Sequence, residues 1–310
     1  MTIRRITLLM TALAWPLLPC AADPGHEIRI EDINAQIAAN PNLPDLYFQR
    51  AVNYREINRL ADARADWEKC LTLQRGFLPA SRELARLDEL ENHRNEGIQR
   101  LEKAISAAPP EASFHLPGCY ALLADMQLKA GTNEAALIAA EKGISLSPEM
   151  SIDLYLLRAE AQRRLGKHDD RVRDLASATA KLKSFVLRIA WIEALIDAGR
   201  SAEVLPEIQK EIDTSRYRSS WLIRRARVRL HDQKKEDAMA DLQAALTEIE
   251  PRIRPEFPDL SLVCDRALIH ALQGKREEAA KELAAAKTRG ADGWMTRVLE
   301  AVLSEKKSGL

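Results

Sequence analysis

Small residues recur along the chain at a fixed distance, and larger apolar residues follow them in a constant frame. Ala51 is followed twelve residues later by Ala63, and Trp67 comes four residues after that. The frame begins again at Ala85, which lies 34 residues after Ala51. Residues three or four positions apart share one face of an α-helix, so the pattern predicts amphipathic helices packed in pairs.

The frame recurs often enough to predict seven units. Their first residues lie near Pro44, Leu78, Pro117, Ile152, Phe185, Ser219 and Leu260, which gives spacings of 34, 39, 35, 33, 34 and 41 residues. The facing positions must be small because paired helix axes approach to roughly 8–10 Å. Glycine ends first helices, as at Gly131, and proline blocks continuation, as at Pro148. The unit from Phe185 fits least well, because Ile192 stands where a small residue belongs.

These residues resemble the tetratricopeptide repeat (TPR), whose period is 34 residues. The best local matches are Tyr47, Ala51, Tyr54, Ala63 and Trp67 in one unit, and Tyr120, Leu123, Ala124, Ala136 and Pro148 in another. The resemblance implies an all-α protein, a right-handed α-solenoid of antiparallel helix pairs whose first helices line a concave side. A non-repeating helical bundle, or another class of paired-helix repeat, is the alternative.

The ends of the chain differ from the repeats. We divide the sequence into a signal peptide (1–22), a leading segment with a short helix (23–43), the repeat array (44–291) and a capping helix with a tail (292–310). The short leading helix is expected from Glu31 to Ala39. The capping helix is expected to begin at Asp292, because aspartate is a favoured N-cap residue.

The first residues predict export. Arg4 and Arg5 precede an uncharged apolar stretch over 6–18, and small residues end at Ala22. This is the arrangement of a secretory signal peptide, so we expect cleavage after Ala22 and a periplasmic or secreted protein. The apolar stretch is short of the roughly 20 residues that span a bilayer. An uncleaved anchor is the alternative.

Cys20 offers a second route to the envelope. The segment Leu17–Cys20 resembles a bacterial lipobox, although Pro19 departs from the small residue usual before the cysteine. Lipidation of Cys20 would make the protein an outer-membrane lipoprotein. We expect contact with a membrane only in that case.

Composition and spacing give no sign of catalysis. The 46 basic and 46 acidic residues balance, which argues against a chain-wide surface for nucleic acid. The six histidines and four cysteines form no pair at a metal-ligand spacing, and no phosphate-binding glycine loop appears. We therefore predict no catalytic residue, metal or cofactor. An enzyme or enzyme subunit with a site across the groove stays open as an alternative.

The resemblance implies binding through the first helices. Residues at the projecting positions of those helices are the candidate partner-binding residues: Phe48, Arg55, Arg82, Arg86, Arg163, Arg164, Arg224 and Arg227. The Lys and Asn set with which some family members grip a C-terminal carboxylate is absent. Arginine forks suit carboxylates, which predicts an acidic or mixed-charge peptide.

A simpler interpretation, which we favour, pairs these arginines with acids of neighbouring helices and makes Phe48 a packing residue. The function predicted is a non-catalytic scaffold in the periplasm or envelope that binds a peptide or partner helix of an unidentified protein. A lipid-anchored envelope assembly factor is the remaining alternative.

Overall fold

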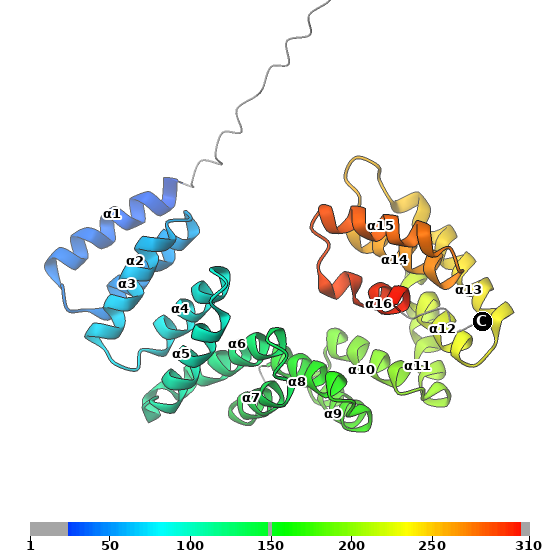
Figure 1. Ribbon diagram of the computed structural model, residues 1–310, viewed down its shortest axis with the longest axis horizontal. Coiled ribbons are helices and arrows are strands. Elements are labelled where there is room, and N and C mark those ends of the chain that lie inside the picture. The colour runs from blue at the N-terminus through cyan, green and yellow to red at the C-terminus, as the bar shows by residue number, and fades with distance from the viewer. Residues whose placement is uncertain (1–23, 148–150, 305–310) are drawn as a thin grey trace, which may run out of the picture. The chain divides into compact units, whose positions relative to one another are not determined.

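The computed structural model describes residues 24–147 and 151–304, and within these ranges the chain forms helices and no strand. The chain divides into two compact units, Met1–Pro148 and Glu149–Leu310, which we describe separately. Each unit is built from antiparallel helices that follow one another along the chain (Figure 1). The predicted all-α solenoid of helix pairs is confirmed. The predicted signal peptide and Cys20 lie outside the described residues.

Unit 1 holds one leading helix and three helix pairs. The leading helix is α1 (Pro24–Ala39), and the pairs are α2 (Pro44–Glu56) with α3 (Leu60–Leu73), α4 (Leu78–Leu90) with α5 (Arg94–Ser106), and α6 (Leu116–Lys129) with α7 (Asn133–Leu146). A short 3₁₀ helix, η1 (Pro110–His115), occupies the proline-rich connector before α6. The first helices α4 and α6 contact each other, and α1 packs along α2.

Unit 2 holds four pairs and a final helix. The pairs are α8 (Ile152–Arg164) with α9 (His168–Leu182), α10 (Phe185–Asp197) with α11 (Ser201–Thr214), α12 (Ser219–His231) with α13 (Lys235–Ile249), and α14 (Leu260–Leu272) with α15 (Arg276–Thr288). A 3₁₀ turn, η2 (Glu250–Arg252), precedes α14, and α16 (Gly293–Ser304) ends the array. The first helices α8, α10, α12 and α14 contact one another in sequence, and α16 packs on α14.

Every pair turns in the same way. One residue after each first helix has a positive φ: Asn58, Asn92, Gly131, Gly166, Gly199, Gln233 and Gly274. The next residue donates its backbone N–H to a carbonyl five positions earlier, as Lys167 does to Gln162 at 2.9 Å. This is the Schellman ending of a helix, for which glycine and asparagine are suited. The seven turns repeat the predicted spacings.

The small residues of the repeat pack as predicted. Ala51, Ala63 and Ala85 are wholly buried, and Trp67 fills the space between them and the next pair. Gly97 faces the carbonyl oxygen of Ala85, and a Cβ atom there would lie only 2.9 Å from it. The close approach of paired helices therefore explains why the frame demands alanine or glycine.

The unit that fitted least well differs as its sequence indicates. Ile192 is fully buried where other first helices carry alanine. Its helix, α10, packs more extensively on the preceding α9 than on its own partner α11, and Pro206 lies inside α11. A bulky residue at the small position keeps this pair from closing as tightly as the others.

The two end helices differ in how well they were predicted. Helix α1 begins at Pro24, seven residues before the expected start, because Ile30 and Ile33 extend its buried face toward α2. Helix α16 begins beside Asp292, whose carboxylate accepts the backbone N–H of Met295 at 3.3 Å. The predicted N-cap is thus confirmed, and Leu299 of α16 is buried.

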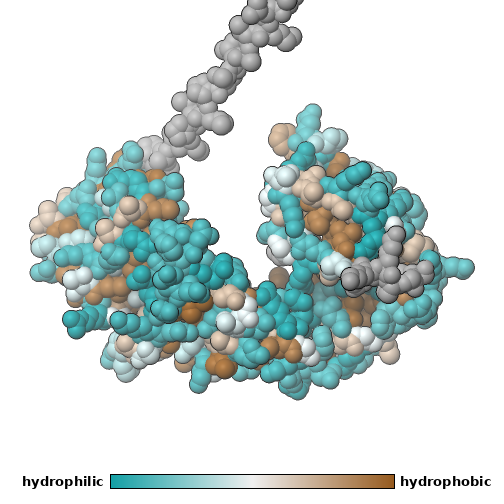
Figure 2. All heavy atoms as spheres, viewed as in Figure 1, coloured by the Kyte–Doolittle hydropathy of each residue, from teal (hydrophilic) through white to brown (hydrophobic). Residues whose placement is uncertain are grey.

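The surface of each unit is mainly hydrophilic on the face shown in Figure 2, with small separate hydrophobic areas. None of the helices among the described residues combines the length and the apolar character needed to cross a membrane. The thiols of Cys70, Cys119 and Cys264 are free and buried. Burial raises the pKa of Cys70 to about 12 and that of Cys119 to about 11, so neither thiol is a nucleophile near neutral pH.

Candidate functional site

The eight candidate residues all lie on first helices, and the structure brings seven of them to three carboxylates. Arg55, Arg82 and Arg86 surround Glu83 in unit 1. In unit 2, Arg163 and Arg164 bind Glu160, and Arg224 and Arg227 bind Glu193. We name these groups the Glu83, Glu160 and Glu193 clusters. Phe48 lies instead at a pocket between α1 and α2.

The Glu83 cluster joins α2 to α4. Arg55 donates from Nη1 to Glu83 Oε2 at 2.6 Å, and Arg86 donates from Nη1 to Oε1 at 3.0 Å. Arg82 Nε approaches Oε1 at 3.4 Å without the geometry of a hydrogen bond. Glu83 is buried, with 4% of its side chain exposed, whereas Arg86 is half exposed at 49%. The carboxylate therefore lies beneath the arginines rather than beside them.

Charge in the Glu83 cluster does not cancel. Arg55 also binds Glu56, an exposed residue, at 2.7 Å. Three guanidinium groups thus meet two carboxylates, and the cluster carries one net positive charge. Each guanidinium has five N–H donors, so Arg82 and Arg86 keep donors that Glu83 does not use. The cluster can accept a further carboxylate.

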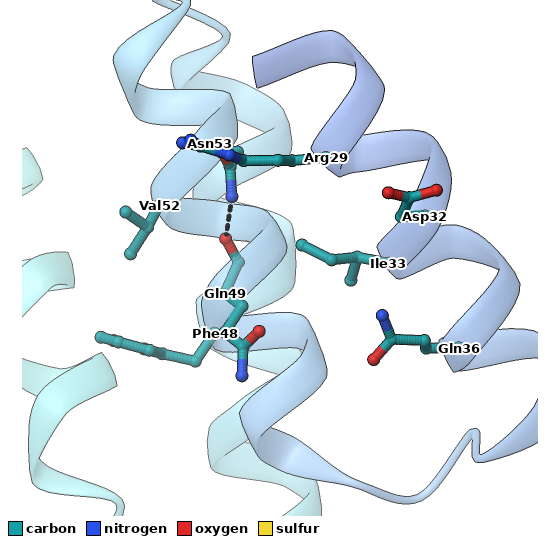
Figure 3. A pocket seen from close by; sticks show the side chains of 8 residues that line it. All are labelled: Arg29, Asp32, Ile33, Gln36, Phe48, Gln49, Val52 and Asn53. Carbon is teal, nitrogen blue, oxygen red and sulfur yellow. Dashed lines mark hydrogen bonds between the residues drawn. The ribbon is translucent and has the colours of Figure 1, made fainter. Parts of the chain in front are cut away.

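An open pocket of about 470 Å³ lies between α1 and α2 in the same unit. Figure 3 shows its lining: Arg29, Asp32, Ile33 and Gln36 from α1, and Phe48, Gln49, Val52 and Asn53 from α2. Arg29 extends toward α2, and Asn53 donates to the Gln49 carbonyl at 2.8 Å. The pocket combines apolar side chains with polar groups, as small binding sites do.

Phe48 serves both packing and the pocket. Its ring meets that of Phe77 edge to face, with centroids 5.6 Å apart, and it packs against the core of unit 1. Phe48, Val52 and Arg55 lie at i, i+4 and i+7 on α2, so they share one helix face. The apolar pocket therefore continues along α2 into the Glu83 cluster.

The Glu160 cluster links α8 to the end of the chain. Arg163 donates two hydrogen bonds to Glu160, at 2.8 and 2.7 Å, and Arg164 donates one at 2.8 Å. Arg297 of α16 reaches the same carboxylate at 3.3 Å. Partial burial opposes ionisation, but these arginines lower the pKa of Glu160 to about 2. Arg297 was not among the predicted residues.

The Glu193 cluster links α10 to α12 and is the most buried of the three. Arg224 Nε donates to Glu193 at 2.8 Å, and Arg227 Nη1 donates at 2.7 Å. Arg227 also lies 3.8 Å from Asp197, a residue that pairs with Arg171 at 2.7 Å. Burial alone would raise the pKa of Glu193, yet Arg227 and Arg224 lower it to about 2.

Asp265 of α14 is a perturbed carboxyl that the sequence did not single out. Desolvation raises its pKa to about 6, against the opposing effect of Arg224. Its side chain is only partly covered by accessible-surface measure, so we take the direction of this pKa shift as firmer than its size. No periodic feature of the sequence distinguishes Asp265 from the paired acids.

Comparison with known proteins gives one sequence relative. No family model matches the chain. A DnaJ protein P58IPK homolog from Arabidopsis thaliana is 27% identical over 147 residues, which are 45% of this chain and 30% of that protein. The match therefore spans less than a third of that relative's length.

Solved structures share the architecture at low sequence identity. The C-terminal part of a TPR repeat-containing protein from Cytophaga hutchinsonii superposes with a TM-score of 0.57 and 17% identity, over 73% of this chain and 91% of that one. A tetratricopeptide repeat protein from Parabacteroides merdae gives a TM-score of 0.48 and 14% identity, over 80% and 99%. With its seven helix pairs and their 34-residue spacing, the chain has the fold of the tetratricopeptide-repeat proteins.

Proposed function

We propose that the protein is a non-catalytic scaffold outside the cytoplasm, whose first-helix surface in unit 1 binds an acidic, amphipathic segment of a partner protein. The observation that carries the proposal is the surplus positive charge of the Glu83 cluster. Its arginines are fixed from below by a buried carboxylate and keep unused donors. Arginines held in this way bind carboxylates at a lower entropic cost than mobile ones.

The neighbouring pocket supplies the second half of the recognition. Val52 and Phe48 offer apolar contacts at one end of α2, and Arg55 lies two turns away at the other. A ligand that fits both would carry an apolar anchor and acidic residues a few positions apart. Coulombic attraction near a protein surface falls with added salt, so binding should weaken as ionic strength rises.

A direct binding assay tests this. The full mature chain is titrated into a labelled synthetic peptide of Glu and Leu residues, and into the same peptide with Lys in place of Glu. Arg86→Gln should weaken binding of the acidic peptide by about tenfold, the equivalent of about 1.4 kcal/mol for one charge-assisted hydrogen bond. Glu56→Gln should tighten it, because it frees donors of Arg55.

Arg59→Gln is the matched control. Arg59 carries the same charge on the same unit, but it pairs with Asp62 in the turn after α2 and lies outside the cluster. Its substitution should leave affinity almost unchanged. Equal binding of both peptides, or equal loss from Arg86→Gln and Arg59→Gln, would show that net charge and not this surface is responsible.

Export is the second part of the proposal and needs its own measurement. Support comes from the basic, then apolar, then small residues over 1–22. Mass spectrometry of the mature protein decides between the two expected products. A free amino group on Asp23 indicates cleavage and release, and a diacylated Cys20 indicates an envelope lipoprotein. An intact Met1 would contradict both.

A further inference from the structure

Three side chains with metal-binding atoms meet in the last helix pair of unit 2, α14 and α15, drawn in orange tones in Figure 1. They are His270 on α14 and the pair Glu278 and Glu282 on α15. One ligand atom from each lies within 4.8 Å of the others. His270 Nδ1 is 3.7 Å from Glu282 Oε2 and 3.9 Å from Glu278 Oε1.

The histidine nitrogen lies in this group without a hydrogen-bond partner. The His270 side chain is 8% exposed, and both its Nδ1 and Glu282 Oε2 are buried atoms that no donor or acceptor satisfies. A separation of 3.7 Å is too long for a hydrogen bond between them. Buried polar atoms of this kind are almost always paired, so something must lie between the two.

A metal ion fits that gap. Zinc binds histidine nitrogen at about 2.0–2.1 Å and carboxylate oxygen at about 2.0–2.2 Å, which places two ligands of one ion about 3.4 Å apart. The distances found here exceed this by a few tenths of an ångström, which small side-chain rotations can close. One nitrogen and two carboxylates suit zinc better than magnesium or calcium, because these prefer oxygen ligands alone.

The surroundings also fit a ligand set. Arg266 Nε lies 3.0 Å from Glu282 Oε1, the oxygen that faces away from His270. An outer partner on the second oxygen of a ligating carboxylate is a common way to orient it. With Arg266 included, the group carries one net negative charge when both carboxylates are ionised and the imidazole is neutral, which favours a cation.

We propose that His270, Glu278 and Glu282 bind a divalent transition metal ion of the zinc class, which joins α14 to α15. Three protein ligands leave a coordination position for water. The spacing of these residues hid the site from the sequence, because the histidine and the two glutamates come from opposite sides of a helix turn. The inference is independent of partner binding, which we assign to unit 1.

Zinc binding to the full mature chain tests the proposal. The metal-stripped protein competes for Zn²⁺ with a chromophoric chelator, and one strong site per chain is expected. His270→Gln and Glu282→Gln should each weaken that site at least tenfold, as loss of a ligand does. Glu277→Gln is the matched control, because Glu277 is an exposed acid on α15 beside Glu278 that is not in the group. It should leave affinity unchanged.

Co²⁺ gives a readout that does not depend on stability. The visible absorption of tetrahedral Co²⁺ should appear with the wild-type chain and with Glu277→Gln, and should be lost in His270→Gln. Circular dichroism confirms that each variant stays helical, and Glu278→Gln, at an exposed position, serves where a buried substitution unfolds the pair. Absence of a strong site, or equal affinity in all variants, would overturn the proposal.

Discussion

Glu193 should be the most costly single charge to remove from unit 2. Its carboxylate is 7% exposed and accepts hydrogen bonds from Arg224 and Arg227, whose side chains are 19% and 14% exposed. Glu193→Gln keeps the shape of the side chain but removes the negative charge. Arg227 would then have only Asp197 at 3.8 Å, and Arg224 only the Ser220 carbonyl at 3.0 Å.

Two independent routes give the same magnitude. A pKa of about 2 against an ordinary value of 4.5 corresponds to about 3 kcal/mol of stability at pH 7. Breaking a buried ion pair by removing one partner costs about 3–5 kcal/mol, because the other charge is left uncompensated. We expect Glu193→Gln to lower the free energy of unfolding of unit 2 by about 3 kcal/mol.

Urea unfolding followed by circular dichroism measures this, and hydrogen exchange of α10 and α12 locates it. Glu203→Gln is the control, since Glu203 also binds an arginine, Arg200, at 2.6 Å but is 52% exposed. Exposed pairs contribute about 1 kcal/mol or less, so this control should change little. Equal effects of the two substitutions would refute the role of burial.

The pH dependence gives a second check on Glu193. Because its folded-state pKa lies below the unfolded value, its contribution to stability is complete above about pH 4.5. It is lost as pH falls from there toward 2, where the folded state also takes up the proton. The difference between wild type and Glu193→Gln should therefore be constant near neutrality and close in acid. A difference that stays constant to pH 2 would contradict the pKa.

Three further substitutions test other features of the fold. Asp265→Asn should stabilise unit 2 at pH 7 by about 1–2 kcal/mol, less than the full shift to a pKa of about 6 because the side chain keeps some solvent; urea titrations at pH 7 and pH 3.5 should show the gain only at pH 7, since it arises as pH rises through 3.8 to 6. Gln233→Gly should raise the free energy of unfolding by about 0.5–1 kcal/mol, because Gln233 holds φ at 61°, and a loss in urea unfolding would contradict this. Gly97→Ala should cost about 1–3 kcal/mol, since a Cβ atom would lie 2.6 Å from Met126 Cε, whereas Gly293→Ala, which meets nothing, should be neutral in thermal unfolding.

The fold was predictable because its signals are local and repeat. Six of the seven predicted first helices begin at the predicted residue, and the seventh begins one residue early, at Leu116. Small residues and turn residues fix each pair within a span of 34, so one unit checks the next. The longer α1 was missed although Ile30, Ile33 and Ile37 have helical spacing, because the predicted signal peptide drew the boundary too near.

The site was predictable only in part. The sequence placed the arginines on first helices, but it could not say which acid each one faces. Arg227 and Glu193 are 34 residues apart, and Arg55 and Glu83 are 28 apart, so partners lie about one repeat away. A search for opposite charges at that distance could find them. Arg297 and Glu160 are 137 residues apart, a contact that depends on the path of the whole unit.

The internal carboxylates divide the candidate residues into two kinds. Arg224 and Arg227 are mostly buried and serve a carboxylate that is buried with them, so an incoming peptide would have to break bonds that hold α10 to α12. Arg86 is half exposed and shares its carboxylate with two other arginines, so it can bind a ligand without releasing Glu83. Fixed arginines with surplus charge recruit acids, and fixed arginines without it stabilise the fold. On this reasoning, Arg86→Gln should affect binding more than stability, and the loss of Arg227 should do the reverse.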